Sequence, residues 1–379
     1  MSLVDMKHML QHACHHSYAV GAFEVVSLEL LDGIIMAAEQ AHAPVILSLT
    51  ESHFEHSSFE LMMPAVEAAA IRAQVPVAIH FNHGAGLESA VNGIRLGCNG
   101  VQVDLAHLDP ADNTQITRQV VEAAQACGIP VEGKPGDLVC VSLAEIKAYV
   151  ERTGVDFLAI SVDVAHGQMK GKSELDYSQL KQINEALKMP LVIHDGSGLS
   201  DEQCRQLIAN GISKINGGTA LFTVAGKQIR ENVRTDTSAD CTGLLKDINR
   251  VIAVEVERCI RLWGAAGRAA DVLAQCQPWS PVEHLIIYNV EGLDDVGAKT
   301  MMAEGRRVLA TIPGVREVFT GEAVQADASY RYTWLVRFCH PAVIDNYREH
   351  PAHVAFADNL FRPVAGKRIS IDFQSVVEH

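Results

Sequence analysis

The chain has 379 residues, enough for one large domain and a second domain of ordinary size. Hydrophobic residues make up 48% of it and charged residues 20%, and no apolar run approaches the ~20 residues of a membrane span, so we expect a soluble protein with no membrane partner. The formal net charge of −15 opposes binding to nucleic acid, because no basic stripe offsets it locally. A small molecule is therefore the expected ligand.

Two further features indicate the compartment and exclude cysteine-based sites. The first residues, MSLVDMKHMLQHACHH, contain no apolar signal-peptide core, which favours a cytoplasmic location. The nine cysteines are scattered without CxxC spacing, so the sequence predicts reduced thiols and neither a disulfide framework nor a cysteine-ligated zinc.

Short β-rich apolar runs alternate with longer segments of helical period through about 230 residues. Strands are predicted at Ala19–Glu24, Val45–Leu49, Val77–Phe81, Gly100–Asp104, Ile129–Glu132, Phe157–Ser161, Leu191–His194 and Ser213–Asn216. Helices are predicted at Leu30–Ala41, Phe59–Ala73, Leu87–Leu96, Thr114–Cys127, Leu143–Thr153, Tyr177–Leu187, Glu202–Asn210 and from Thr219 onward. Such βα units predict a (β/α)₈ TIM barrel. An open doubly wound sheet is the alternative, which the lack of a Gly-rich dinucleotide fingerprint disfavours.

In such a barrel the active site lies at the carboxyl ends of the strands, so the polar residues that end each run become candidates. They are Glu24, Thr50, Asn82, His83, Asp104, Glu132, Asp163, His166, His194, Asp195, Asn216 and Thr219. Three of them, His83, His166 and His194, follow the third, sixth and seventh strands. Three histidines that converge and leave an open position suit a catalytic zinc, so we predict one zinc ion per chain.

Six motifs follow the same order of strand ends. They are GAFEV at 21–25, PVILSLTE at 44–51, HFNHG at 80–84, VDVAHGQMKG at 162–171, IHDGSG at 193–198 and KINGGT at 214–219. In order, spacing and residue type they resemble the class II metal-dependent aldolases that act on fructose or tagatose bisphosphate, over roughly residues 1–235. The resemblance implies a (β/α)₈ barrel and a zinc-dependent carbon–carbon lyase.

The resemblance also implies roles for individual residues. His83, His166 and His194 match the metal ligands, and Thr50 matches a substrate-contacting Ser or Thr. Positions that hold the substrate's phosphate and adjoining hydroxyls are matched by Gly167, Lys170, Gly196, Ser197, Asn216 and Thr219. Carbon–carbon cleavage beside a ketone produces an enediolate, whose oxygens the zinc would stabilise as a Lewis acid.

The sequence departs from the family where protons are transferred. Asn82 stands in place of the acidic residue just before the first metal histidine, and an amide cannot act as its general acid or base. Glu132 is retained, but Lys134 replaces a second acid and would repel a second cation next to Asp104, so we expect no second metal ion. Gly218 replaces a further carboxylate.

Carboxylates appear instead where the family has neutral residues, at Glu24, Asp163 and Asp195. Asp195 follows the third predicted ligand, so it is a candidate for proton transfer or for a partner of the metal site, with a turn cap as the equal alternative. Asn82, Glu132 and Asp195 are therefore the candidate catalytic residues. An added anion near the phosphate-binding turn disfavours a doubly charged phosphate, which predicts a changed or unphosphorylated substrate.

These features predict an aldolase-type lyase, diverged from standard fructose-bisphosphate aldolase, that acts on a sugar substrate: a ketose or ketose phosphate. There are two alternatives. One is an isomerase or epimerase on the same metal site, and the other is a non-catalytic protein that binds a sugar phosphate. The retained ligands favour an enzyme, because a metal ion with an open position is poorly explained as structure alone.

The order of predicted strands and helices changes after the aldolase-like domain, residues 1–265, and a predicted linker at residues 266–281. Strands are predicted at 284–291, 316–323, 330–338 and 367–373, with helices near 297–311 and 341–360. This βαββαβ order predicts a ferredoxin-like α+β domain over residues 282–379. With IPGV at 312–315 and YREHPAHVAF at 347–356, it resembles the stress-responsive dimeric A/B barrel (Dabb) domains. Such domains pair their sheets, so we expect a homodimer or higher homo-oligomer.

Overall fold

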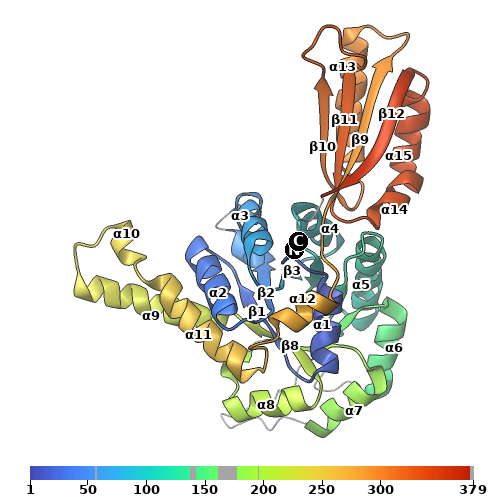
Figure 1. Cartoon of the computed structure of the whole chain (residues 1–379). Helices are drawn as coiled ribbons and strands as arrows, with labels where there is room; N and C mark the ends of the chain where they lie inside the picture. Colours follow the sequence, from blue (N-terminus) through green and yellow to red (C-terminus); the bar gives the residue numbers. More distant parts are fainter. Residues whose placement is uncertain (56–57, 137–141, 161–176, 195, 376–379) are drawn as a thin grey trace. The chain divides into compact units, whose positions relative to one another are not determined.

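A computed structural model describes residues 1–55, 58–136, 142–160, 177–194 and 196–375 of the chain (Figure 1). Its first part is a closed barrel of parallel strands in chain order, in which β1 is hydrogen-bonded to both β2 and β8. The strands are β1 (Val20–Glu24), β2 (Val45–Thr50), β3 (Val77–Gly84), β4 (Gly100–Val103), β5 (Val131–Gly133), β6 (Phe157–Ile160), β7 (Leu191–Ile193) and β8 (Ile212–Gly217). Nearly all of their residues are buried, as continuous apolar runs predict for a parallel sheet covered on both faces. The predicted TIM barrel is confirmed.

The helices between these strands begin and end at signals that the sequence contains. They are α2 (Leu28–Gln40), α3 (Phe59–Arg72), α4 (Leu87–Leu96), α5 (Pro110–Gln125), α6 (Leu143–Thr153), α7 (Tyr177–Leu187), α8 (Asp201–Ala209) and α9 (Thr219–Thr235). Ser142 caps α6 and forms a capping box with Glu145. The same helix ends at Gly154, whose φ of 74° a side chain would strain.

Helix α1 (Met6–His15) precedes the barrel and was not predicted. Just before it, Leu3 forms a parallel bridge with Val77, the first residue of β3. The sulfur of Met6 packs on Gly100, the first residue of β4, where an added Cβ would come within 2.2 Å of it. Helix α1 therefore lies across the amino ends of the strands, opposite the end that carries the candidate residues.

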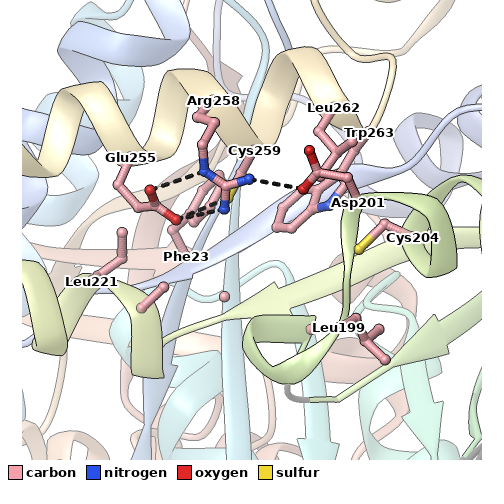
Figure 2. A pocket seen from close by; sticks show the side chains of 13 residues that line it. Phe23, Leu199, Asp201, Cys204, Leu221, Glu255, Arg258, Cys259, Leu262 and Trp263 are labelled. Carbon is pink, nitrogen blue, oxygen red and sulfur yellow. Dashed lines mark hydrogen bonds and ion pairs between the residues drawn. The ribbon is translucent and has the colours of Figure 1, made fainter.

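Three more helices follow the last βα unit of the barrel: α10 (Cys241–Leu244), α11 (Ile248–Leu262) and α12 (Ala269–Gln275). Helix α11 packs on α2 and α9. Figure 2 shows how it is also tied to α8, because Arg258 bonds both Glu255 on its own helix and Asp201 at the start of α8. The barrel wall near β1 and β8 is thereby braced from outside.

Trp263 follows α11 and fills the space between that helix and the barrel. Its ring stacks on Phe23 of β1, with centroids 5.6 Å apart. A Cβ at Gly21 would come within 2.9 Å of the same indole, so glycine is needed there. Beside the two rings lies a cavity of about 60 Å³, which Gly196 of the turn Gly196–Gly198 also lines (Figure 2). The indole thus supports the turn that, by the family resemblance, is predicted to hold the substrate's phosphate.

Replacing Trp263 by alanine is expected to lower the free energy of unfolding by about 3–5 kcal/mol, because it removes a buried aromatic side chain and enlarges a cavity. Chemical denaturation followed by circular dichroism measures the change. Val254→Ala on α11 is the matched control, since that side chain is 71% exposed and its truncation should leave the free energy unchanged. Equal losses in both variants would contradict the packing role given to the indole.

The second compact unit consists mainly of the residues from Trp279 onward, with two short earlier segments, Val91–Gly97 and Glu122–Ile129. The other residues up to Pro278, α12 among them, belong to the first unit. Its elements are β9 (Val282–Val290), α13 (Asp295–Leu309), β10 (Val315–Glu322), β11 (Tyr332–Phe338), α14 (Val343–Glu349), α15 (Pro351–Phe356), a π-helical turn (Ala357–Phe361) and β12 (Ala365–Gln374). The sheet is antiparallel in the order β10-β11-β9-β12, which confirms the ferredoxin-like prediction. No helix in the described ranges is long and apolar enough to cross a membrane.

The two faces of this sheet differ. On one face Trp334 packs edge-on against Phe356, with centroids 5.6 Å apart, and a Cβ at Gly305 of α13 would come within 2.3 Å of the same indole. The strand register places the alternate residues on the opposite face. The apolar ones there are Leu285, Ile287, Phe319, Leu335, Ile369, Ile371 and Phe373, which we call the open face.

Candidate functional site

A pocket of about 540 Å³ opens where the barrel strands end. It is lined by Glu24, Thr50, Ser52, His53, His83, Asp104, Lys134, His194, Asn216, Gly218, Thr219 and Phe222. Most of the strand-end residues singled out in the sequence are among them. Closure of the barrel brings the carboxyl ends of all the strands to one rim, so residues far apart in the sequence share one pocket.

His83, the residue before the last of β3, has a backbone conformation that is uncommon for a side-chain-bearing residue. Its φ is 52°, and the pairing of β3 with β4 shifts register between Phe81 and Gly84. The backbone N–H of His83 donates to the side chain of Gln102 at 2.7 Å. A left-handed residue of this kind costs about 1–3 kcal/mol and tends to occur at functional sites.

Asp104 holds the ring of His83. The Nδ1–H of His83 donates to Asp104 Oδ2 at 2.8 Å, and Lys134 Nζ donates to the same oxygen at 3.1 Å. The hydrogen bond from His83, together with the nearby charge of Lys134, holds the pKa of the Asp104 carboxyl well below its ordinary value despite burial. With Nδ1 occupied, Nε2 is the nitrogen of His83 left to bind a ligand.

His194, just after β7, is held in the same way by Glu132. Its Nε2–H donates to Glu132 Oε1 at 2.6 Å, while Glu132 Oε2 accepts from Lys214 Nζ at 2.7 Å. Burial opposes ionisation of Glu132, but Lys214 and His194 outweigh it and hold the pKa of the carboxyl well below its ordinary value. Burial lowers the pKa of His194, so the ring is neutral near pH 7. Its buried Nδ1 has no partner among the described residues.

The spacing of these two rings agrees with the predicted zinc site. Their centroids lie 5.2 Å apart. Two imidazoles on a tetrahedral zinc, with Zn–N bonds of about 2.0 Å, would place their centroids roughly 5 Å apart. The third predicted ligand, His166, lies outside the described residues, and within these no group of three His, Cys, Asp or Glu side chains could hold a metal ion. The fit therefore rests on two ligands and their carboxylate partners.

A chain of polar contacts leads from Asn82 to the pocket wall. Asn82 and Glu132 are fully buried and do not line the pocket. Asn82 Nδ2 donates to Thr50 Oγ1 at 3.4 Å, and Thr50 donates in turn to Glu24 Oε1 at 2.8 Å. The other oxygen of Glu24 lies 3.0 Å from Nδ1 of His53. The pocket thus has a second cluster of titratable groups, apart from the two predicted ligands.

Two titratable members of the described part of the site, His53 and Lys214, were not predicted, and neither were the lining residues Ser52 and Phe222. His53 lies in the 3₁₀ helix η1 (Glu51–Glu55), after the last residue of β2, and no motif of the sequence includes it. His53 follows the last residue of β2 by three positions, and this closeness to a strand end is the only sequence feature that could have indicated it. Lys214 lies inside KINGGT, but a lysine in a strand gives no sign that it is fully buried against Glu132.

The residues predicted to hold phosphate and hydroxyl groups are described in part. Asn216 lines the pocket and is almost fully buried, and neither atom of its amide has a partner in the described chain. Thr219 begins α9, so the N-terminus of that helix also reaches the pocket. Gly196 begins a 3₁₀ turn, and a Cβ there would come within 2.4 Å of Ile215.

Ser197 belongs to the same 3₁₀ turn. The remaining candidates lie outside the described residues. They are Asp163, His166, Gly167, Lys170 and Asp195.

Two family models match the chain. The model described as fructose-bisphosphate aldolase class-II matches residues 4–268, and the model described as stress responsive A/B barrel domain matches residues 282–375. The first match includes all the strands of the barrel, and the second includes all the strands of the ferredoxin-like sheet.

Individual relatives agree with the first match. A fructose-bisphosphate aldolase of Geobacillus stearothermophilus is 33% identical over 287 residues, which cover 72% of this chain and all of that protein. A fructose-bisphosphate aldolase of Staphylococcus epidermidis is 32% identical over 285 residues, which cover 71% of this chain and all of that protein. Among solved structures, the YdjI aldolase of Escherichia coli K12 superposes with a TM-score of 0.65 at 30% identity, covering 70% of this chain and 99% of that one. The structure of a putative fructose-1,6-bisphosphate aldolase of Coccidioides immitis superposes with a TM-score of 0.62 at 25% identity. The superposition covers 72% of this chain and all of that one.

Proposed function

Because the chain belongs to the class II fructose-bisphosphate aldolase family, we propose that its barrel, residues 1–265, is a metal-dependent lyase that cleaves a carbon–carbon bond in a ketose or ketose phosphate. One observation carries the proposal. His83 and His194 each bond a carboxylate through one ring nitrogen and line the same pocket, which leaves their other nitrogens for a shared ligand. Carboxylate–histidine pairs of this kind orient metal ligands in catalytic sites.

We infer one zinc ion per chain, held by His83, His194 and His166. When bound, zinc supplies a Lewis acid for the ketone oxygen of the substrate. Lys134 places an ammonium group 3.1 Å from Asp104 Oδ2, and this charge would repel a second cation at that carboxylate.

The wall formed by β8 and α9 suits the polar groups of a sugar. The amide of Asn216 has both a donor and an acceptor free for hydroxyl groups, and the N–H groups that begin α9 at Thr219 favour a phosphate or another anion. Gly167, Lys170, Gly196 and Ser197 complete the proposed contacts. Glu24 adds a negative charge next to Gly218, so we infer a substrate with fewer charges than a sugar bisphosphate.

The test combines zinc content, measured by elemental mass spectrometry, with cleavage assays on fructose and tagatose 1,6-bisphosphates, fructose 1-phosphate, fructose and tagatose. We expect one zinc per chain and cleavage of a singly phosphorylated or unphosphorylated ketose. Cleavage of fructose bisphosphate at rates ordinary for aldolases would refute the changed substrate. Zinc without cleavage would favour the isomerase or binding alternatives, and a protein that binds no metal would refute the proposal.

We also propose that residues 282–379, joined to the barrel domain through residues 266–281, dimerise the chain. The open face is a contiguous apolar surface, on which the exposed fractions of Phe319 and Phe373 are 50% and 48%. At one end of it Arg337 pairs with Glu283 at 2.6 Å and with Glu317 at 3.3 Å. An apolar patch with a polar edge is typical of a protein interface, and a second copy of the same sheet would cover it.

Replacing Ile371 by glutamate should convert the dimer to monomers, because it places a charge among the apolar side chains of the open face, on the edge strand β12. Size-exclusion chromatography with light scattering measures the mass. Val296→Glu is the matched control, because that side chain is 72% exposed on α13 and lies outside the open face. A dimer that persists in the Ile371 variant, or a native protein that is monomeric, would contradict the interface.

A further inference from the structure

We infer that His53, oriented by Glu24, transfers the proton of the substrate hydroxyl at the bond that breaks, an inference that rests on the lyase function proposed above. Cleavage beside a ketone turns this hydroxyl into an aldehyde, so some group must accept its proton. Asn82 is an amide without a titratable proton, and it is fully buried. Asn82 therefore cannot accept the proton, and Asp195, the other candidate for proton transfer, lies outside the described residues.

Glu24 and His53 stand at the pocket wall as a carboxylate–imidazole pair. Their side chains are 13% and 32% exposed, and Glu24 Oε2 lies 3.0 Å from His53 Nδ1. Neither of these two atoms has an aligned hydrogen-bond partner among the described residues, so the observation is their proximity. A carboxylate beside Nδ1 favours the tautomer with the proton on Nδ1, which leaves Nε2 as the base.

Both side chains are held from several sides. Thr50 donates to Glu24 Oε1 at 2.8 Å, which fixes the carboxylate at the end of β1. The ring of His53 meets that of Phe222 edge-on, with centroids 5.5 Å apart. A Cβ at Gly218 would come within 3.0 Å of Glu24 Cγ, so the absence of a side chain at 218 makes room for the carboxylate. Relative to the aldolase family, Glu24 adds a carboxylate and Gly218 removes one, and the space left by the second change accommodates the first.

The other titratable groups that line the described part of the pocket already have partners. Asp104 accepts from both His83 and Lys134 through one oxygen. His194 donates to Glu132. These groups belong to the predicted metal site, whereas Glu24 and His53 bond none of them.

The step balances without any further reactant. In the cleavage direction Nε2 of His53 accepts the hydroxyl proton, and the electron pair of the O–H bond becomes the second bond of the aldehyde carbonyl. The carbon–carbon bond breaks, and its electron pair passes to the carbon next to the ketone. Solvent protonates that carbon, and His53 returns its proton to solvent. In the aldol direction His53 donates the proton to the forming alkoxide.

The test compares His53→Gln and Glu24→Gln with the native protein on the ketose that the native protein cleaves. For His53→Gln we expect kcat to fall about 10²–10⁴-fold, with KM and zinc content unchanged, because a general base is lost. Glu24 is a positioning residue, and its variant should lose about 10²-fold in kcat because the imidazole is no longer aligned. Glu151→Gln on α6 and His15→Gln on α1 are exposed controls that should keep the native rate.

A second measurement separates this role from damage to the fold or to the metal site. Exchange of the carbon-bound proton of dihydroxyacetone or its phosphate with deuterated water needs the metal site but no hydroxyl deprotonation. Both variants should keep the native exchange rate while cleavage falls. Unchanged cleavage in His53→Gln, or a parallel loss of cleavage and exchange, would overturn the inference and leave the lyase function standing. A native protein that cleaves no ketose would overturn both.

Discussion

Replacing His194 by alanine is expected to remove zinc from the protein and to reduce carbon–carbon cleavage by three orders of magnitude or more. The ring of His194 contributes one of three proposed ligands, and its buried Nδ1 has no partner in the part of the chain that the structure describes. Loss of the Lewis acid removes several kcal/mol of transition-state stabilisation, and 4 kcal/mol corresponds to about 10³-fold in rate. Elemental mass spectrometry and cleavage assays at saturating zinc measure both effects.

His15→Ala is the control for the removal of a histidine, because that side chain is exposed at the end of α1. It should keep one zinc per chain and the native rate. If His194→Ala retained both, His194 would be excluded as a ligand. Zinc binding that persists without cleavage would place the histidine in the reaction and outside the coordination sphere.

Replacing Lys214 by methionine is expected to lower both the free energy of unfolding and the affinity for zinc. Lys214 and Glu132 are both fully buried and lie 2.7 Å apart, so the substitution leaves an uncompensated carboxylate inside the barrel. Breaking a buried pair in this way costs about 3–5 kcal/mol. Because Glu132 also holds His194, zinc affinity should fall by about 10–100-fold. Urea denaturation and zinc titration against a chelator measure the two changes.

The double variant Lys214→Met, Glu132→Gln should lose less stability than the sum of the single variants, because the remaining group is no longer a buried lone charge. Lys181→Met supplies the contrast, since the side chains of Lys181 and its partner Glu185 are 65% and 66% exposed and the pair should contribute nothing measurable. Additive losses in the double variant would mean that the Lys214–Glu132 contact is not coupled.

The relation of sequence to fold differs between the barrel and the helices around it. Each strand is a short apolar run bounded by turn signals, and Ser142, Glu145 and Gly154 mark the ends of α6 directly. These are local features, so the order of elements could be predicted without knowing which residues meet. Helices α1 and α11 could not be placed in this way, because their apolar faces pack on surfaces that exist only once the barrel has closed.

The barrel, the ferredoxin-like sheet and the polar residues at the strand ends could all be predicted from local patterns. A parallel strand delivers its last residues to one rim whatever surrounds it. The contacts that these residues make could not be predicted in this way. Glu132 and Lys214 come from β5 and β8, and Glu24 and His53 come from β1 and the 3₁₀ helix η1 after β2. Such pairs form only when the barrel closes and buries the side chains. Neither the closure nor the burial of one particular side chain produces a repeating pattern in the sequence that could be used to predict the pairs.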